Sequence, residues 1–177
     1  MNHATEPLTL SLPSDAVVIL IGAAGSGKST FVARHFPADS IVSADRIRAD
    51  LGGQGAGQER NEDVFARVHQ LVEERAAAGL LTVIDATNTR GPGRAELGWH
   101  AHRQRRPLVA IALHLPLQIC LDQNARRPRP VPADVVRRQV ADLRHLETDL
   151  ETEGYAAVTV CRSRADIDNF RVSFGSS

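Results

Sequence analysis

The stretch Gly22-Ala-Ala-Gly-Ser-Gly-Lys-Ser29 decides the fold of this chain. It satisfies the pattern G-x-x-x-x-G-K-S, it follows an apolar, β-branched run at residues 16–21, and residues 30–35 after it can open a helix. A phosphate-binding loop, or P-loop, needs this order of buried strand, glycine-rich loop and helix. The stretch therefore predicts a P-loop, and an ordinary glycine-rich turn between a strand and a helix is the alternative.

The P-loop pattern implies a nucleotide and its metal ion. Backbone N–H groups made accessible by Gly25 and Gly27 would surround phosphates at the N-terminus of the helix. Lys28 would bridge the outer phosphates and Ser29 would ligate a metal ion, so the expected cofactors are ATP, or another nucleoside triphosphate, and Mg²⁺. The expected nucleotide-binding residues of the loop are Gly22, Gly25, Ser26, Gly27, Lys28, Ser29 and Thr30.

The chain uses lysine only once. Of its 21 basic residues, 20 are arginine, and the exception is Lys28. A position that keeps lysine against this bias needs a compact ammonium on a flexible stem, which a planar guanidinium cannot imitate. The guanine-binding pattern N-K-x-D needs a lysine in addition to Lys28, and the chain has none. The pattern is therefore absent, which argues against a Ras-like GTPase.

Length and composition favour one globular domain. The 177 residues are 42% hydrophobic and 24% charged, so we expect residues 1–177 to form a single domain, with about 15 N-terminal and about 10 C-terminal residues peripheral. Lys+Arg and Asp+Glu both number 21, so the net charge gives no general attraction to nucleic acid or to membranes.

The longest apolar run, residues 16–24, is too short to span a bilayer. We expect a cytoplasmic protein without a membrane partner, in which Cys120 and Cys161 are reduced and buried.

Hydrophobic patterning predicts alternating strands and helices. Further strands are expected at residues 40–43, 80–85, 108–115 and 155–160, and helices at 64–79, 95–106, 117–124 and 132–146, with a last short helix from Ser163. The apolar residues Phe65, Val68, Leu71 and Val72 are expected to lie on one face of the first of these helices, and the glycine-rich residues 52–58 are expected to form a mobile loop. This order predicts an α/β fold of the P-loop NTPase type, with a parallel sheet of about five strands and helices on both faces.

Acidic residues follow two of the predicted strands, where folds of this class bind their ligands. Asp85 ends an apolar strand and suits a second ligand of Mg²⁺, or it only caps the next turn. Asp45 follows the strand at residues 40–43 and could accept the proton of an incoming hydroxyl, or it is the N-cap of the next helix. Arg48, three residues further on, would orient Asp45 and the acceptor.

Positive charge is concentrated between Arg103 and Arg138, where eight arginines outnumber two aspartates and the local net charge is +6. Within this segment, Arg126-Arg-Pro-Arg-Pro-Val-Pro132 is too rich in proline for a helix. We expect it to form an arginine-rich lid that closes over the phosphates and neutralises charge during transfer. A solvated basic turn is the alternative.

Five segments of the sequence together are similar to those of a known family. They are residues 22–31 with the P-loop, I-V-S-A-D-R-I-R at 41–48, V-I-D-A-T-N at 83–88, N-A-R-R at 124–127 and V-P-A-D-V at 131–135. In this order and spacing they resemble the 5′-hydroxyl polynucleotide kinase domain, including the kinase module of bacterial RNA-repair enzymes, over about residues 17–160. The resemblance implies that Asp45 is the general base for the 5′-hydroxyl and that Arg48 binds the acceptor. It also implies that Arg127 and Arg129 are lid residues on the phosphates of ATP.

The leading interpretation is an ATP- and Mg²⁺-dependent kinase of the 5′-hydroxyl end of RNA or DNA. Its expected catalytic residues are Lys28, Asp45, Arg48 and Arg127, and its expected metal ligands are Ser29 and Asp85. One alternative is a P-loop kinase of a small-molecule alcohol, such as a nucleoside, a sugar or an antibiotic. Another is a nucleotide-binding regulatory module with little turnover. With 4% aromatic residues and no net charge, the chain is expected to bind only the end of a nucleic acid, and not a long stretch of it. The sequence leaves the oligomeric state open.

Overall fold

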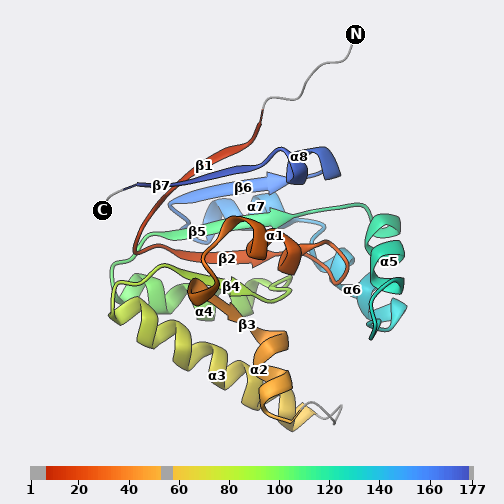
Figure 1. Cartoon of the computed structure of the whole chain (residues 1–177), viewed down its shortest axis with the longest axis horizontal. Helices are drawn as coiled ribbons and strands as arrows, with labels where there is room; N and C mark the ends of the chain where they lie inside the picture. Colours follow the sequence, from red (N-terminus) through yellow and green to blue (C-terminus); the bar gives the residue numbers. More distant parts are fainter. Residues whose placement is uncertain (1–6, 53–57, 176–177) are drawn as a thin grey trace.

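The computed structural model describes residues 7–52 and 58–175, and a parallel sheet of five strands lies at its centre. The strand order is β3-β4-β2-β5-β6 (Figure 1). The strands are β2 (Val17–Ile21), β3 (Ile41–Ser43), β4 (Thr82–Asp85), β5 (Leu108–Leu113) and β6 (Ala157–Cys161). This arrangement confirms the predicted α/β fold and its parallel sheet. Most of the mobile loop expected at residues 52–58 lies outside the described residues.

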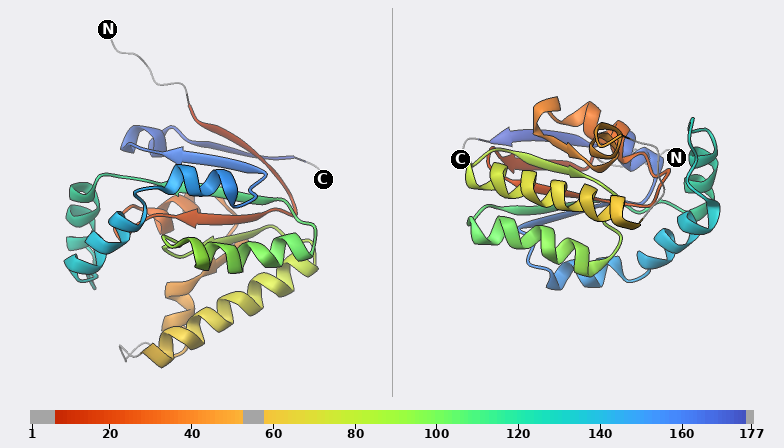
Figure 2. Two further views of the ribbon diagram at one scale, coloured as in Figure 1. Left: turned by 180° about the vertical axis from the view of Figure 1, so that it is seen from behind. Right: turned by 90° about the horizontal axis from the view of Figure 1, so that it is seen from below.

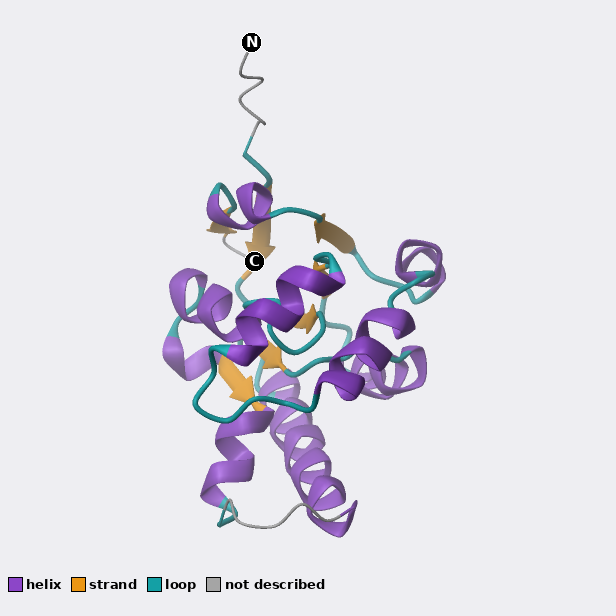
Figure 3. Cartoon of the chain, turned by 90° about the vertical axis from the view of Figure 1, so that its right-hand side faces the viewer, coloured by secondary structure: helices purple, strands orange, loops and turns teal. Residues whose placement is uncertain are grey.

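Helices cover both faces of this sheet, as predicted. One helix, α1 (Lys28–His35), lies in front of the sheet in Figure 1. The view from behind in Figure 2 shows the helices over the opposite face, which are α3 (Gln58–Ala77), α4 (Gly91–Arg103) and α7 (Leu146–Thr152). Figure 3 shows the molecule from the side at which the strands of the sheet end. Three helices lie near this carboxyl edge, and they are α2 (Ala44–Asp50), α5 (Leu117–Ala125) and α6 (Ala133–Asp142). The short η1 (Ala38–Ser40) precedes β3, and α8 (Arg164–Asp168) follows β6.

Two core layers follow from the alternation of side chains along the strands. In β2, Val18 and Leu20 belong to the hydrophobic cluster on one face of the sheet, and Val17, Ile19 and Ile21 belong to the cluster on the other. These five residues are fully buried, because both faces of the central strand are covered. The P-loop therefore leaves the sheet from its middle strand.

Segments near the two ends of the chain form strands that the sequence did not predict. β1 (Thr9–Pro13) and β7 (Arg171–Gly175) make a separate parallel pair, which lies along the upper side in Figure 1. Leu12 of β1 and Phe170, directly before β7, are fully buried in the same cluster as Phe31 of α1. Both strands are only five residues long and mix apolar with polar side chains, so their periodicity is too short to stand out.

The predicted helix at residues 132–146 is wrong in its extent. It ends at Asp142, and α7 begins at Leu146, because the chain between them tightens into turns in which the Leu143 N–H reaches the Val140 carbonyl over 3.2 Å. Pro132, expected to be the first helical residue, is the N-cap of α6. Leu143, at the end of α6, and Leu146, at the start of α7, therefore reach the same buried cluster from two separate helices.

The predicted apolar face of α3 is also wrong at one position. Val64, Val68 and Val72 are buried, whereas Phe65 is 48% exposed. The last short helix begins as predicted, because Ser163 caps α8 in a reciprocal capping box with Asp166. Both cysteines are free and buried, as expected. No helix within residues 7–52 and 58–175 combines the length and the apolar character that crossing a membrane requires.

Candidate functional site

The P-loop joins β2 to α1 through two glycines in a left-handed conformation. Gly25 and Gly27 have φ angles of 82° and 94°, which residues with a side chain rarely adopt. A Cβ atom at Gly25 would also collide with the carbonyl oxygen of Cys120 in α5. Glycine is thus required at position 25 both by the backbone conformation and by the close packing of the loop on α5.

Several amide groups of the loop are available to an anion. Among residues 7–52 and 58–175, the N–H groups of Gly25, Gly27 and the first turn of α1 find no hydrogen-bond partner, and no side chain caps this helix. Unpaired amides at a helix N-terminus attract negative charge, and the helix dipole adds to this attraction. The loop therefore fits the phosphates of the predicted nucleotide.

Lys28 is buried beneath this loop. Its Nζ donates hydrogen bonds to the carbonyl oxygens of Gly22, at 2.7 Å, and Ala23, at 2.9 Å. Burial lowers the pKa of Lys28 to about 8, and the negative charge of Asp85 only partly opposes this shift. The compact ammonium group is thus held at the loop by two carbonyl oxygens, which its three donors can satisfy.

Ser29 and Asp85 bring a hydroxyl and a carboxylate together at the start of α1. The Ser29 Oγ donates a hydrogen bond to Oδ2 of Asp85 over 2.9 Å. Burial raises the pKa of Asp85, although the hydrogen bond from Ser29 and the charge of Lys28 oppose the shift. Oxygen atoms of these two kinds are the ligands that Mg²⁺ prefers in proteins, so the pair fits the predicted metal site.

Asp45 lies in the first turn of α2, at the same edge of the sheet as Asp85, which is the register partner of Ser43. Ser43 caps α2 by accepting a hydrogen bond from its backbone, so the alternative role of Asp45 as the N-cap is wrong. Asp45 instead accepts hydrogen bonds from Arg48 on Oδ1, at 2.7 Å, and from Arg127 on Oδ2, at 3.3 Å. Its side chain is 64% exposed, so it remains accessible to a substrate hydroxyl.

The arginine-rich segment forms the loop between α5 and α6. The buried Asn124 closes this loop, because its Nδ2 donates to the Val131 carbonyl at 2.7 Å and its Oδ1 accepts from the Val131 N–H at 3.0 Å. Arg127 reaches Asp45, whereas the side chain of Arg129 contacts no hydrogen-bond or ion-pair partner in the described part of the chain. Closure of this loop over phosphates, as a lid, stays a prediction.

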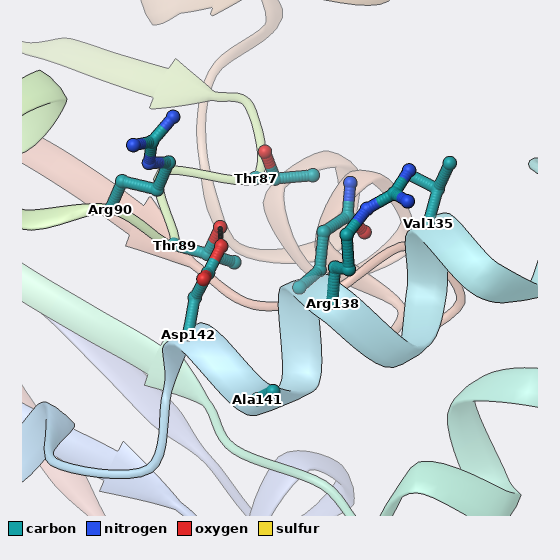
Figure 4. Close-up of a pocket in the computed structure, with 8 residues that line it drawn as sticks. Thr87, Thr89, Arg90, Val135, Arg138, Ala141 and Asp142 are labelled. Atoms are coloured by element: carbon teal, nitrogen blue, oxygen red, sulfur yellow. Dashed lines mark hydrogen bonds between the residues drawn. The ribbon is translucent and has the colours of Figure 1, made fainter.

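A pocket of about 470 Å³ lies between α6 and the loop that follows β4 (Figure 4). The loop contributes Thr87, Thr89 and Arg90 to its lining, and α6 contributes Val135, Arg138, Gln139, Ala141 and Asp142. The Oε1 of Gln139 accepts a hydrogen bond from the Ala24 N–H of the P-loop over 2.8 Å. On the other wall, the Thr87 carbonyl accepts one from the Gly22 N–H over 2.9 Å. Both walls of the pocket are therefore fixed against the P-loop.

The buried Arg94 anchors the same loop and was not expected from the sequence. Its side chain is 1% exposed and donates two hydrogen bonds to Glu153, at 2.6 and 2.8 Å. It also donates to the carbonyl oxygens of Asn88 and Thr89. Burial opposes the charged form, but the hydrogen bond and charge of Glu153, together with the charges of Tyr155 and Asp149, outweigh burial and raise the pKa of Arg94. No motif marks this pair, because its partners are 59 residues apart.

Comparisons with known proteins agree with this architecture. The sequence model of a protein family described as an AAA domain matches residues 17–147, and no curated protein matches the chain. Among solved structures, a chain of the Pnkp1/Rnl/Hen1 RNA repair complex is similar, with 20% sequence identity and a TM-score of 0.64. The match covers 83% of this chain and 47% of that one, so this chain spans about half the length of that protein.

Two further similar structures are matched over most of both chains. A sugar kinase from Janibacter sp. has 21% identity and a TM-score of 0.59, and the match covers 83% of this chain and 84% of the kinase. The APS kinase CysC of Mycobacterium tuberculosis, in complex with AMPPNP and APS, has 16% identity and a TM-score of 0.53, with 89% and 95% covered. At these identities the likeness shows a shared fold, that of the P-loop kinases.

Proposed function

Because the chain belongs to the AAA domain family, we propose that it is a P-loop kinase that transfers the γ-phosphate of ATP to the 5′-hydroxyl end of RNA or DNA. One observation carries this proposal: Asp45, an accessible carboxylate bonded to two arginines, lies at the sheet edge where the P-loop and Asp85 also lie. A P-loop alone binds a nucleotide. A carboxylate at this place adds a base for an incoming hydroxyl.

The donor nucleotide would be bound by the P-loop. The unpaired amides of Gly25, Gly27 and the α1 N-terminus would bind its phosphates, and Lys28 would contact the outer ones. Ser29 and Asp85 would hold Mg²⁺, which when bound neutralises charge on the phosphates. Phosphates beside Lys28 would raise its lowered pKa again, because an opposite charge favours the ammonium form.

On the acceptor side, Asp45 would accept the proton of the substrate hydroxyl. The hydroxyl oxygen would then bond to the γ-phosphorus, while the bond from that phosphorus to ADP breaks and ADP leaves. Arg48 donates a hydrogen bond to Oδ1 of Asp45. Oδ2 of Asp45, which accepts a hydrogen bond from Arg127, would face the substrate hydroxyl once Arg127 moves to the phosphates. Arg127 and Arg129 would then neutralise charge on the transferring group.

A polynucleotide end is the acceptor that the sequence motifs favour. The P-loop, the Asp45 and Arg48 pair, the Asp85-Ala-Thr-Asn88 segment and the arginine-rich loop occur in the order of the 5′-hydroxyl polynucleotide kinase domain. The fold shared with a chain of an RNA repair complex is consistent with this acceptor. Because only an end would be bound, we expect the log of oligonucleotide affinity to fall with log salt with a slope of about −1 to −3.

A kinase of a small-molecule hydroxyl is the second candidate. The pocket of about 470 Å³ has the size of a small-ligand site, and a sugar kinase shares the fold over most of its length. Asp45 would have the same role in both candidates, so they differ only in the acceptor. A regulatory module with little turnover would have no use for an accessible base beside the P-loop.

Transfer of labelled γ-phosphate from ATP tests the proposal. The acceptors would be RNA and DNA oligonucleotides with a 5′-hydroxyl, nucleosides and simple sugars, and the matched controls would be the same oligonucleotides already phosphorylated at the 5′ end. Labelling of the 5′-hydroxyl oligonucleotides alone supports the proposal. Faster labelling of a nucleoside or a sugar than of the oligonucleotides favours the small-molecule kinase. ATP consumption that no acceptor stimulates favours the regulatory module.

A further inference from the structure

We infer that His69 and His100 form a pH-sensitive link between α3 and α4, which is closed while the pair is neutral and opens when the pair takes up a further proton. The link lies on the face of the sheet opposite to α1. Its opening would loosen α3, the helix on which α2 packs. The inference does not depend on the proposed kinase activity.

The two imidazole rings meet between neighbouring helices. Both views of Figure 2 show α3 and α4 side by side. His69 comes from the middle of α3 and His100 from the last turn of α4, and Nδ1 of His69 lies 3.0 Å from Nε2 of His100. At this distance a single hydrogen atom fits between the two nitrogens, so one ring donates and the other accepts.

The surroundings of the two outer ring nitrogens favour one arrangement of the protons. Nε2 of His69 lies 3.8 Å from a carboxylate oxygen of Glu96, which favours a hydrogen atom on this nitrogen. Nδ1 of His100 is buried and has no hydrogen-bond partner within residues 7–52 and 58–175, so a hydrogen atom there would be a donor without an acceptor. In the neutral pair, His100 therefore donates from Nε2 and His69 accepts at Nδ1.

A further proton has no favourable place in the closed pair. The neutral pair carries two ring hydrogens, and the charged pair carries three. Because only one of them fits between the rings, the other two must occupy the outer nitrogens, whichever ring bears the charge. Nδ1 of His100 then becomes a buried donor without a partner, which is costly. Protonation therefore favours an open arrangement in which the rings separate.

Charged groups of both helices surround the pair. Glu96 of α4 approaches His69, but its side chain is mostly exposed, so solvent weakens this attraction. Arg103 of α4 and Glu73 of α3 pair with each other over 3.2 Å. Beneath the helices, β2 and β5 consist of apolar residues. Asp85 ends β4 at the carboxyl edge of the sheet, whereas the last turn of α4 lies shortly before β5 begins.

The pKa of His100 agrees with this arrangement. Burial lowers the pKa of His100, the neighbouring His69 and Arg103 lower it further, and Glu73 opposes the shift. The pKa in the folded protein thus lies below the ordinary value of 6.5. As the pH falls through this value, the unfolded chain binds more protons than the folded one, so the link loses stability on the acidic side.

A pocket beside the pair offers room for the open arrangement. It has a volume of about 600 Å³ and is lined by both histidines together with Ala95, Glu96 and Trp99 of α4. A charged His69 ring that turns into this pocket would approach the Glu96 carboxylate. It would also approach the exposed indole of Trp99, whose face attracts cations. The charged ring thus finds in the pocket the partners that the closed pair does not offer.

Opening of the link would reach the proposed base through α3. Nη2 of Arg48 approaches Oδ1 of Asn61 at 3.5 Å, and Asn61 lies about two turns before His69 on the same helix. Arg48 also donates to Oδ1 of Asp45 over 2.7 Å. A displacement of α3 would therefore disturb the residue that positions Asp45.

Histidine side-chain NMR of the wild-type protein tests the proton arrangement. At about pH 8, we expect both His69 and His100 to carry their ring hydrogen at Nε2. Trp99 is the only tryptophan of the chain, and its ring centroid lies 5.3 Å from that of His100, so its fluorescence reports separation of the pair. We expect a change in fluorescence below about pH 6.5, which should be lost in the double variant His69→Gln/His100→Gln. Its two amides can hydrogen-bond to each other but do not titrate.

Urea denaturation between about pH 5 and pH 8 measures the link as a contribution to stability. Relative to the double variant, the unfolding equilibrium constant of the wild type should stay constant above about pH 7.5. It should then rise by up to about tenfold for each pH unit below 6.5, until the folded pKa is reached. His102→Gln, which removes an exposed histidine of the same helix, is the matched control and should keep the wild-type pH dependence.

Hydrogen exchange locates the opening, with rates corrected for the intrinsic rate at each pH. In the wild type at about pH 5.5, amides of α2 and α3 should lose protection relative to the double variant, while those of β2 and β5 keep theirs.

Three results would overturn the inference. They are a hydrogen atom on Nδ1 of His100 in the neutral protein, a stability difference from the double variant that does not change with pH, and equal protection of α2 and α3 in both proteins at about pH 5.5. The NMR measurement needs no variant, so it decides even if the double variant does not fold. All of these measurements are made without nucleotide or acceptor, so a failure of the proposed function leaves them unaffected.

Discussion

Arg127 donates a hydrogen bond from Nη2 to Oδ2 of Asp45 over 3.3 Å, although 82 residues separate the two in the sequence. The contact joins the loop between α5 and α6 to the start of α2. It occupies the carboxylate oxygen that Arg48 leaves available, so both oxygens of Asp45 are engaged. An arginine that can leave this carboxylate for the phosphates of a nucleotide would uncover the base only when the donor is present.

Removal of Arg127 should therefore affect catalysis more than removal of Arg129. Arg127→Ala should lower kcat by about 100-fold or more with every acceptor, because it removes charge stabilisation of the transferring group. Arg129→Ala, which loses no observed contact, is the matched control and should lower kcat less. Steady-state kinetics on an oligonucleotide and on a small acceptor would measure both, and equal losses in the two variants would contradict the special position of Arg127.

Asp45→Asn should abolish phosphoryl transfer and leave the fold intact. The amide has nearly the same volume but cannot accept a proton, so kcat should fall by about 100-fold or more. Ser43 caps α2 and the pair with Arg48 is exposed, so the free energy of unfolding should change by less than about 1 kcal/mol. ATP titration and chemical denaturation provide the controls. An active variant, or one that no longer folds, would refute the assignment of Asp45 as general base.

Lys28→Arg should fail almost as severely as Lys28→Ala. The ammonium is buried and within 3 Å of the carbonyl oxygens of Gly22 and Ala23, a space that the larger planar guanidinium does not match. We expect turnover to fall by about 100-fold or more in both variants. Near wild-type turnover of Lys28→Arg, measured with labelled ATP, would remove the argument from the single lysine.

The lowered pKa of Lys28 predicts an alkaline gain in stability. With a pKa of about 8 in the folded protein against an ordinary value of 10.5, the unfolded chain binds more protons between these two pH values. The free energy of unfolding of the nucleotide-free wild type, relative to Lys28→Met, should therefore be constant below about pH 7 and rise by about 2 to 3 kcal/mol by pH 10. Urea denaturation of both proteins across this range measures the difference, and a flat difference would contradict the shift.

Gly25→Ala should destabilise the protein, whereas Gly93→Ala should stabilise it. Position 25 combines a positive φ with a collision against the Cys120 carbonyl, and we expect a loss of more than about 2 kcal/mol. Gly93 lies within α4 with open space around it, so alanine there should add about 0.4 to 1 kcal/mol. Thermal denaturation of the two variants would compare them, and a tolerated Gly25→Ala would show that the loop can move away from α5.

The features that the sequence predicted are local ones. The P-loop, the buried strands around it and the capped start of α8 are each encoded within about ten consecutive residues, so their patterns can be read directly. Ser43 illustrates a signal that was present but missed. A serine directly before a helical segment is as good an N-cap as the aspartate two residues later, and it is the residue that caps α2.

The remaining features depend on contacts between distant segments. The pairing of Arg127 with Asp45 and of Arg94 with Glu153 joins residues whose spacing carries no periodic signal. The pocket likewise needs α6 to pack beside the loop after β4, so Arg90 and Arg138 could not be recognised as neighbours from their positions in the chain. Which of many surface arginines face one cavity is decided by tertiary packing.

The parallel pairing of β1 with β7 makes the order of synthesis important for this protein. On the ribosome, β2, the P-loop and α1 are made early, but the cluster that contains Leu12 and Phe31 is completed only by Phe170. Until Phe170 and β7 have left the exit tunnel, the nascent chain therefore carries an uncovered apolar surface beside α1. Such a surface is what chaperones bind on incomplete chains, so the part of this protein that carries the P-loop depends for its completion on residues translated long after it.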